Sequence, residues 1–255
     1  MRYKLGIVLS GGGSRGLAHA GVLRALAENG IEPDCIAGTS AGALVGALYA
    51  SGRGTDEILR FFADVNPFRI SRLAMNKPGV IDSEKLLGAF GQWYPEDSFS
   101  ALGKPLFVTG TDLVSGRLEV WSSGPLVRPL LASSTVPFVL SPTRVDGRNF
   151  VDGGIVNNFP VEPLFGLCDA ILGVYATPLS APAEGDLQST FAVMRRSLEI
   201  GMYHASKRKF QHADLVLSPP GLTGFDTFDL RRHVEIVEIG YRAALDQMEA
   251  IRAIL

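Results

Sequence analysis

A Gly-x-Ser-x-Gly pentapeptide occupies residues 38–42, with the sequence Gly38-Thr39-Ser40-Ala41-Gly42. In many hydrolases this pentapeptide holds a nucleophilic serine on a sharp turn between a strand and a helix. An apolar run precedes it and small apolar residues follow it, which fits that turn. The alternative is that Ser40 or Thr39 only caps the following helix. We interpret Ser40 as a nucleophile, because the positive end of the helix dipole would also favour negative charge on its oxygen.

A nucleophilic serine needs a group that takes its proton, and in most hydrolases a histidine does this. The chain has 4 histidines, which are His19, His204, His212 and His233. The last three follow Asp152, so the Ser-Asp-His order of α/β-hydrolases is formally present. However, His204 and His212 belong to a basic helical stretch, and His233 follows two arginines. His19 is expected to pack inside the first helix, so a histidine triad is the less favoured alternative.

Asp152 is a second candidate for the base. It lies at the end of a predicted strand, where α/β proteins build their sites, and Gly153 and Gly154 would let another segment come close. Asp-Gly is also a common turn, and we expect only a hairpin turn at Asp146-Gly147. A free aspartate has a pKa of about 3.9 and is a weak base. It can work where proton removal accompanies attack in a dry, oriented site.

A glycine cluster at residues 11–16 lies between the first predicted strand and the first predicted helix. Its Gly-x-Gly-x-x-Gly pattern matches the dinucleotide-binding fingerprint. That fingerprint also needs an acidic residue at the end of the second strand, and Asp34 stands before that strand instead. A tight turn without a ligand is a further alternative. We favour an oxyanion site, because amides at such a turn can bind an anion, and it would comprise Gly11, Gly12, Gly13, Ser14, Arg15 and Gly16.

These motifs need a scaffold that brings distant strand ends together. Residues 4–52 alternate as strand, helix, strand and helix, which is typical of a parallel sheet with right-handed crossovers. The pattern therefore predicts an α/β fold. Further helices are predicted over 55–65 (with Thr55 as N-cap), 82–94, 125–137, 188–210 and 229–255, and further strands over 104–113, 117–123, 148–153, 169–177 and 213–219.

The composition is that of an ordinary globular protein of 255 residues, 46% hydrophobic and 20% charged. We predict one domain over residues 1–255, since a single α/β domain can have this length. A net charge of -2 gives no basic field for nucleic acid. Cys35 and Cys168 lie far apart in sequence and lack metal-ligand spacing, so no metal is expected. We expect both to be reduced thiols in a cytoplasmic protein. The apolar runs at 5–9 and 41–50 are too short for a signal peptide and a membrane span.

Three motifs together resemble the patatin-like phospholipase family. Residues 11–16, 38–42 and 152–154 occur in the order and approximate spacing of that family, and residues 132–142 are similar as well. The resemblance covers roughly residues 4–220, and a C-terminal amphipathic helix at about 229–255 follows. It implies a three-layer α/β/α sandwich with a mainly parallel, Rossmann-like sheet, as in the small bacterial members.

The resemblance also implies lipid acyl hydrolysis by a Ser-Asp dyad without a histidine. Ser40 would be the nucleophile and Asp152 the base, and the Gly11–Gly13 amides, with Arg15 nearby, would form the oxyanion hole. No cofactor is expected. The third motif is Asp-Gly-Gly where many members have Asp-Gly-Ala, and this departure leaves the aspartate in place.

The expected partner is a lipid or a fatty acyl ester, with ester and thioester both open. Peripheral contact with the inner face of a membrane is compatible with this substrate, and no nucleic acid is expected. Residues 66–79 interleave apolar and basic side chains, which fits a lid, a membrane-contact surface or a partly buried connector. A non-catalytic lipid-binding or regulatory protein on the same fold is the alternative function. The oligomeric state is left open.

Overall fold

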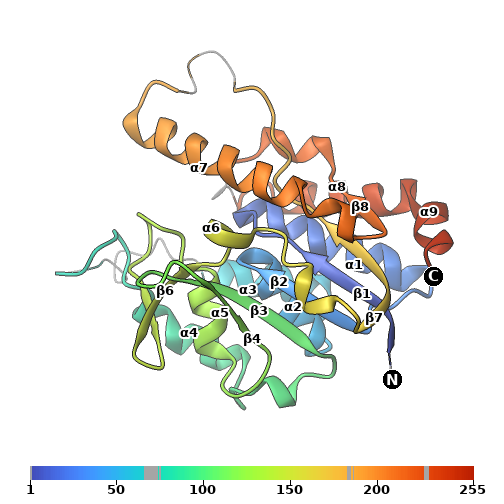
Figure 1. Ribbon diagram of the computed structural model, residues 1–255, viewed down its shortest axis with the longest axis horizontal. Helices are drawn as coiled ribbons and strands as arrows, with labels where there is room; N and C mark the ends of the chain where they lie inside the picture. Colours follow the sequence, from blue (N-terminus) through green and yellow to red (C-terminus); the bar gives the residue numbers. More distant parts are fainter. Residues whose placement is uncertain (1, 66–73, 75, 183–184, 186, 227–229) are drawn as a thin grey trace.

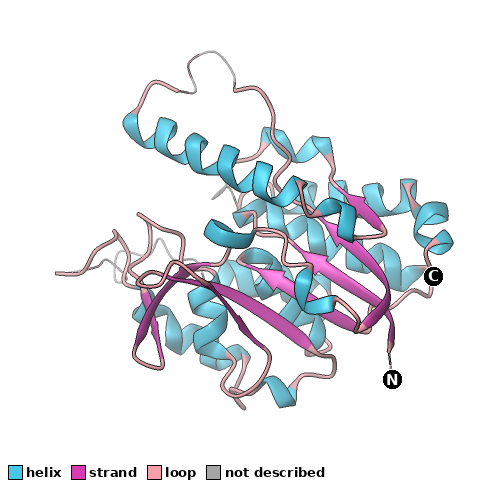
Figure 2. Cartoon of the chain, viewed as in Figure 1, coloured by secondary structure: helices cyan, strands magenta, loops and turns pink. Residues whose placement is uncertain are grey.

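The computed structural model describes residues 2–65, 74, 76–182, 185, 187–226 and 230–255. One mixed sheet lies at the centre, and helices pack on both of its faces (Figures 1 and 2). The strands are β1 Tyr3–Leu9, β2 Cys35–Thr39, β3 Leu106–Asp112, β4 Leu118–Trp121, β5 Thr143–Val145, β6 Arg148–Asp152, β7 Cys168–Val174 and β8 Leu215–Leu217. The α-helices are α1 Ala18–Glu28, α2 Ala41–Ala50, α3 Thr55–Asp64, α4 Leu87–Trp93, α5 Val127–Ser133, α6 Gly154–Asn157, α7 Thr190–Lys207, α8 His233–Asp246 and α9 Met248–Ala253.

The strand order is β5-β6-β3-β2-β1-β7-β8, and β4 pairs with β3 outside this path. The pairs from β3 through β2, β1 and β7 to β8 are all parallel. β4, β5 and β6 add antiparallel pairs at the β3 end of the sheet. The prediction of a mainly parallel sheet is therefore confirmed. The central parallel strands β1, β2 and β7 are largely buried, which explains why they are mainly apolar runs in the sequence.

The two faces of the sheet bury separate clusters of unequal size. Side chains alternate along β1, so Ile7 and Leu9 join the larger cluster while Val8 joins the smaller one. The larger cluster packs α1, α2 and α8 against the sheet. The smaller cluster centres on Phe159, with Tyr203 of α7 partly buried against it. Helices cover both faces, so the α/β/α sandwich is confirmed, but the layer that contains α7 is thin.

Helix α7 is the least buried long helix among the described residues. It runs across the top of the molecule in the view of Figure 1. Of its 18 residues only Ser206 is buried. By contrast, nine of the ten residues of α2 are buried between the sheet and its neighbours. Apart from residues such as Tyr203, which packs against the smaller cluster, much of α7 therefore faces a cavity or solvent.

Four local predictions need correction. The N-cap of α3 is Gly54 rather than Thr55, and the Gly54 N–H donates to the Glu57 carboxylate at 3.2 Å. Helix α5 ends at Ser133, before Pro137, since the following residues turn toward β5. The last predicted helix begins at His233 and is divided at Gln247 into α8 and α9. The helix predicted over 188–210 is α7, and it ends at Lys207.

Candidate active site

The ends of β2 and β6 meet along one edge of β3. Thr39 of β2 pairs with Thr109, and Asp152 of β6 pairs with the next residue, Gly110. β4 pairs with the opposite edge at both positions. Because β2 is parallel to β3 and β6 is antiparallel to it, the carboxyl ends of β2 and β6 point toward each other. Ser40 and Asp152 are thus brought together although they are 112 residues apart in sequence.

Ser40 sits on the sharp turn that the pentapeptide predicts. Its φ of 53° and ψ of -127° are rare for a residue with a side chain. The Ser40 N–H donates to the buried Ser133 Oγ at 2.9 Å. Gly42 permits the turn, because a Cβ there would lie 2.1 Å from the Leu9 carbonyl oxygen. The Ser40 hydroxyl does not cap α2 and points to Asp152 instead, so helix capping does not account for it.

Asp152 is held in place by four hydrogen bonds. Its Oδ2 accepts from Ser40 Oγ at 2.5 Å, and its Oδ1 accepts from the Gly154 N–H at 2.8 Å. Its own N–H donates to the Thr135 carbonyl at 2.9 Å, and its carbonyl accepts from Thr111 Oγ1 at 2.9 Å. Burial raises the pKa of the Asp152 carboxyl to about 6, and the bonds from Ser40 and Gly154 limit that rise. The carboxylate is therefore a better base than a free aspartate.

The two glycines after Asp152 are needed by this geometry. A Cβ at Gly153 would lie 2.5 Å from Thr109 Oγ1. A Cβ at Gly154 would lie 2.8 Å from Asn158 Oδ1 and 2.9 Å from Met202 Cε of α7. The second glycine of Asp-Gly-Gly therefore gives space to Asn158 and to α7.

The glycine loop divides into engaged and open amides. The Gly11 N–H donates to Asn158 Oδ1 at 3.1 Å, and Asn158 Nδ2 donates to Thr177 Oγ1 at 3.1 Å. In the part of the chain that the structure describes, the Gly12 and Gly13 amides donate to no protein group. Both residues line the same cavity as Ser40. Of the predicted Gly11–Gly13 amides, those of Gly12 and Gly13 are therefore the ones left open to a ligand.

Arg15 lies in the short helix after the glycine loop. Its N–H closes the loop by donating to the Gly12 carbonyl at 3.2 Å. Its guanidinium forms an ion pair with Glu199 of α7 at 3.5 Å. Burial lowers the pKa of Arg15, and the nearby Glu199 carboxylate opposes this. Arg15 thus connects the glycine loop to α7, and Ser14 and Gly16 are buried beside it.

The four histidines belong to other elements than Ser40 and Asp152. His204 belongs to α7, His212 to a short helix before β8, and His233 begins α8. His19 is fully buried, and its Nε2 bonds the Ser10 carbonyl at 2.8 Å. Burial lowers the pKa of His19 to about 4, so it is neutral at physiological pH. Each histidine is described, and none of them hydrogen-bonds Ser40 or Asp152.

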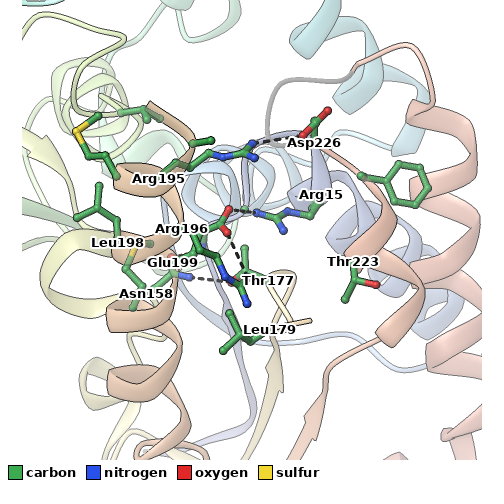
Figure 3. A pocket seen from close by; sticks show the side chains of 18 of the residues that line it. Arg15, Asn158, Thr177, Leu179, Arg195, Arg196, Leu198, Glu199, Thr223 and Asp226 are labelled. Atoms are coloured by element: carbon green, nitrogen blue, oxygen red, sulfur yellow. Dashed lines mark hydrogen bonds and ion pairs between the residues drawn. The ribbon is translucent and has the colours of Figure 1, made fainter. Parts of the chain in front are cut away.

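A cavity of about 530 Å³ opens over Ser40 and Asp152. Helix α7 forms much of its wall, where Leu198 lies beside charged residues of the same helix (Figure 3), and Met202 also lines the cavity. Ile155 of α6 adds to the apolar side. The sequence analysis identified the catalytic candidates but missed α7 as a wall of the site. The signal that could have found it was the apolar residues at 187, 191, 194, 198 and 202, at helical spacing among arginines.

Asn158 is a second residue that the sequence analysis missed. It is almost fully buried and bridges the glycine loop to Thr177 after β7. The only sequence signal was an asparagine pair in an otherwise apolar turn.

The structure does not favour the dinucleotide-binding alternative. That alternative needs an acidic residue that is available to a ribose, but Asp34 Oδ2 accepts from the Lys4 and Leu5 amides at 3.0 Å, at the start of β1.

Most of the segment proposed as a lid, residues 66–73 and 75, lies outside the described residues. Among the described residues, no group of three or more His, Cys, Asp or Glu side chains is arranged to hold a metal ion. Within the same residues, the helices are too short or too polar to cross a membrane. Cys35 and Cys168 are buried free thiols.

Similar folds are found among solved structures. VipD from Legionella pneumophila matches with a TM-score of 0.61 and 16% identity, over 98% of this chain and 67% of that chain. Human GIVD cytosolic phospholipase A2, in complex with a fluorophosphonate inhibitor, matches with a TM-score of 0.51 and 13% identity, over 99% of this chain and 59% of that chain. At these identities the likeness concerns the fold alone.

Comparison with proteins of known sequence identifies the family of this chain. An uncharacterised NTE family protein of Mycobacterium tuberculosis is 35% identical over 167 residues, 64% of this chain and 46% of that protein. Lysophospholipase NTE1 of Pyricularia oryzae is 27% identical over 288 residues, 97% of this chain and 18% of that protein. The chain thus spans less than half the length of these curated relatives. Residues 7–165 match the family described as patatin-like phospholipase, over the glycine loop, the serine turn and Asp152. This chain therefore belongs to the patatin-like phospholipase family.

Proposed function

We propose that this chain hydrolyses acyl esters of lipids through a Ser40–Asp152 dyad. The observation that carries the proposal is the 2.5 Å hydrogen bond from Ser40 Oγ to Asp152 Oδ2 on the floor of the cavity. A hydroxyl within hydrogen-bond reach of a buried carboxylate, on a strained turn, has the geometry of an activated nucleophile. Membership in a family of phospholipases supports an ester-bond hydrolase.

In the first half of the reaction, Ser40 Oγ forms a bond to the acyl carbon and its proton passes to Asp152 Oδ2. The carbonyl oxygen becomes an oxyanion, and the intermediate collapses as the ester oxygen leaves with the proton from Asp152. In the second half, Asp152 takes a proton from water, which attacks the acyl-enzyme. The fatty acid leaves, and the proton returns to Ser40 Oγ.

The open amides of Gly12 and Gly13 are suited to bind the oxyanion. Such a donor contributes about 2.7–4 kcal/mol to transition-state stabilisation in other hydrolases. The Gly11 amide has a structural role instead, because its hydrogen bond to Asn158 Oδ1 holds the loop in place. Burial of Asp152 supports the base role, since a pKa of about 6 brings the carboxyl closer to the working pH.

The walls of the cavity suit one acyl chain on their apolar side. Several residues that line the cavity are also exposed at its mouth, namely Phe138, Leu187, Phe191 and Leu198. Such an apolar rim supports peripheral contact with a lipid surface, where the substrate would enter. We place the protein in the cytoplasm, where it could contact the inner face of a membrane. Reduced thiols at both cysteines fit that compartment.

The test compares dyad variants with matched controls on a soluble fatty acyl ester. Ser40→Ala and Asp152→Asn should each lower kcat/KM by about 10³-fold or more. Ser51→Ala is the serine control, since Ser51 Oγ only bonds the Ala47 carbonyl of its own helix. Asp146→Asn is the aspartate control, because Asp146 lies in the hairpin turn between β5 and β6 and Asn-Gly also suits that turn.

Histidine variants separate the dyad from a triad. His204→Gln, His212→Gln and His233→Gln should keep most of the wild-type kcat/KM. A folded histidine variant as inactive as Ser40→Ala would overturn the dyad.

A fluorophosphonate probe distinguishes an enzyme from a lipid-binding protein on the same fold. Absence of Ser40 labelling, with and without detergent micelles, would favour the binding protein.

A further inference from the structure

A methionine of α7 reaches the space beside the Asp152 carboxylate. The place where a Cβ of residue 154 would stand lies 3.0 Å from Asp152 Oδ1, 2.9 Å from Met202 Cε and 2.8 Å from Asn158 Oδ1. Residue 154 is a glycine, so this space is shared by the carboxylate and the terminal methyl group of Met202. Met202 is partly buried and also lines the cavity.

The two groups that share this space with Asp152 Oδ1 cannot solvate it. A methyl group donates no hydrogen bond, and Asn158 Oδ1 is an acceptor that already takes the Gly11 N–H at 3.1 Å. The amide nitrogen of Asn158 donates to Thr177 Oγ1 at 3.1 Å instead. In the described part of the chain, the Gly154 N–H at 2.8 Å is thus the one protein donor to Oδ1. An apolar contact stands where water would otherwise complete the solvation of this oxygen.

The part of α7 that carries Met202 is docked on the protein. The next residue, Tyr203, packs against the smaller cluster, and its ring lies 6.2 Å from that of Tyr175. Ser206, the buried residue of α7, donates from its Oγ to the Met202 carbonyl at 2.8 Å. Helix α6, which begins at Gly154, contacts the same helix. These contacts hold Met202 at the site although most of α7 is exposed.

Charged side chains do not explain the environment of Asp152. Burial raises the pKa of Asp152 to about 6, against the hydrogen bonds from Ser40 and Gly154, and no charged group is among the causes. The charged groups that line the same cavity are Arg15, Arg195, Arg196, Glu199 and Asp226. Those of the neighbouring strands and of α5 are Asp112, Glu119, Arg128, Arg144 and Arg148. The exclusion of water is therefore what determines how strongly Asp152 holds a proton.

Resting on the proposed function, we propose that Met202 is a positioning residue, which shields the Asp152 carboxylate from water and thereby sets its strength as the base. A carboxylate with less water around it takes the Ser40 proton more readily. The shield belongs to α7, so the base is strong only while this helix covers the site. The alternative is that Met202 is only a part of the wall that receives the acyl chain.

The experiment follows the pH profile of kcat/KM on the soluble fatty acyl ester. Met202→Ala should lower the midpoint of the profile by about 0.5–1 pH unit, because water reaches the carboxylate and favours its charged form. Above the midpoint, kcat/KM should fall about two- to fivefold, since the base is weaker. Met202→Leu keeps an apolar side chain of similar volume, so it should keep the wild-type midpoint.

A second substitution should rescue the shield. In the double variant of Met202→Ala with Gly154→Ala, the added methyl group stands 3.0 Å from Asp152 Oδ1, in the space that Met202 Cε leaves. The midpoint should therefore return toward the wild-type value. The rescue is measured in the midpoint rather than in kcat, because the same methyl group presses on Asn158 Oδ1 at 2.8 Å.

Leu198→Ala is the matched control. Leu198 is an apolar residue of α7 that lines the same cavity one helical turn before Met202, but it supplies none of the three atoms nearest to the space at residue 154. Its substitution should change the KM for the ester and leave the midpoint in place. His204→Gln removes the histidine of α7, which does not line the cavity, and should leave the midpoint in place as well.

A titration without turnover gives the second readout. Carbon NMR of protein labelled at its aspartate carboxyls, assigned with Asp152→Asn, should show Asp152 titrating at lower pH in Met202→Ala than in the wild type. An unchanged titration, or an equal change in Leu198→Ala, would overturn the shield. Failure of the proposed function is a distinct result, in which the titration moves with Met202 but Asp152→Asn hydrolyses the ester as fast as the wild type.

Discussion

Two regions of the cavity differ in how firmly they are packed: the floor, which contains Ser40 and Asp152, and the wall formed by α7. On the floor, Ser40 and Asp152 are only 5% and 7% exposed, and backbone and side-chain hydrogen bonds fix both residues. On the wall, α7 has one buried residue, and ion pairs join it to Arg15 and Asp226. Acyl transfer needs fixed interatomic distances, whereas a lipid needs a wall that adapts to its length and head group.

The difference predicts where substitutions are tolerated. Close contacts of backbone with backbone leave no room on the floor, so even a methyl group is costly there. The wall has space around most of its side chains, and changes there should alter substrate preference before stability. Four predictions test this contrast, beginning with the largest expected effect.

Gly42→Ala should damage the floor most. The added Cβ would lie 2.1 Å from the Leu9 carbonyl oxygen, and rigid backbone cannot move aside without opening the turn at Ser40. We expect a loss of more than about 3 kcal/mol in the free energy of unfolding, together with loss of ester hydrolysis. Urea unfolding and hydrolysis assays measure both. A variant with wild-type stability would show that the floor is not tightly packed.

His19→Ala should come next, through stability rather than chemistry. The side chain is fully buried and holds the Ser10 carbonyl ahead of the glycine loop. Its removal should lower the free energy of unfolding by about 3 kcal/mol, whereas His204→Ala on exposed α7 should change it by less than about 0.5 kcal/mol. The folded His19→Ala protein should still label at Ser40 with a fluorophosphonate. A folded His19→Ala protein that does not label would implicate this histidine in the chemistry.

Asp152→Asn should stabilise the protein while it abolishes hydrolysis. The pKa of Asp152 is raised from 3.8 to about 6 in the folded chain, so the folded state holds its proton more tightly than the unfolded state. The stability due to this proton is complete below pH 3.8 and is lost as the pH rises to about 6. An uncharged asparagine avoids that loss. The variant should therefore gain on the order of 2–3 kcal/mol at about pH 8 and nothing at about pH 3.5.

Thermal unfolding across this pH range measures the gain. In the wild type, kcat/KM should rise with pH through about 6, because the ionised carboxylate is the proposed base. An equal gain in stability at both ends of the pH range would contradict the raised pKa. Asp146→Asn, in the exposed hairpin turn, is measured alongside as the matched control.

Gly201→Ala should have the smallest effect, and a favourable one. Gly201 lies inside α7, and a Cβ there would meet no atom within 4 Å. Alanine is the better helix former, so the free energy of unfolding should rise by about 0.5–1 kcal/mol. Ester hydrolysis should change little. A destabilised Gly201→Ala protein would mean that α7 is packed as tightly as α2.

The same contrast explains what could be predicted from the sequence. The floor leaves a clear pattern, because the serine turn needs small residues such as Gly42 and the strand ends are apolar runs that stop at polar residues. These patterns predicted the sheet, the serine turn and Asp152. They did not predict that Ser133 and Asn158 bond the Ser40 and Gly11 amides, because such bonds join segments far apart in sequence. The sequence of α7 mixes apolar and basic residues. Solvent-exposed helices have the same mixture, so the sequence alone does not identify α7 as a wall of the cavity.

The meeting of β2 and β6 on β3 makes the proposed catalytic pair depend on the pairing register of β6. Adjacent residues of a strand point to opposite faces, about 3.4 Å apart, so a slip of one residue would turn the Asp152 carboxylate away from Ser40. The hairpin of β5 and β6 sets that register where it pairs with Gly110, Thr111 and Asp112. The proposed ester hydrolysis would therefore report correct strand alignment, and we expect it to return during refolding only when this hairpin has docked.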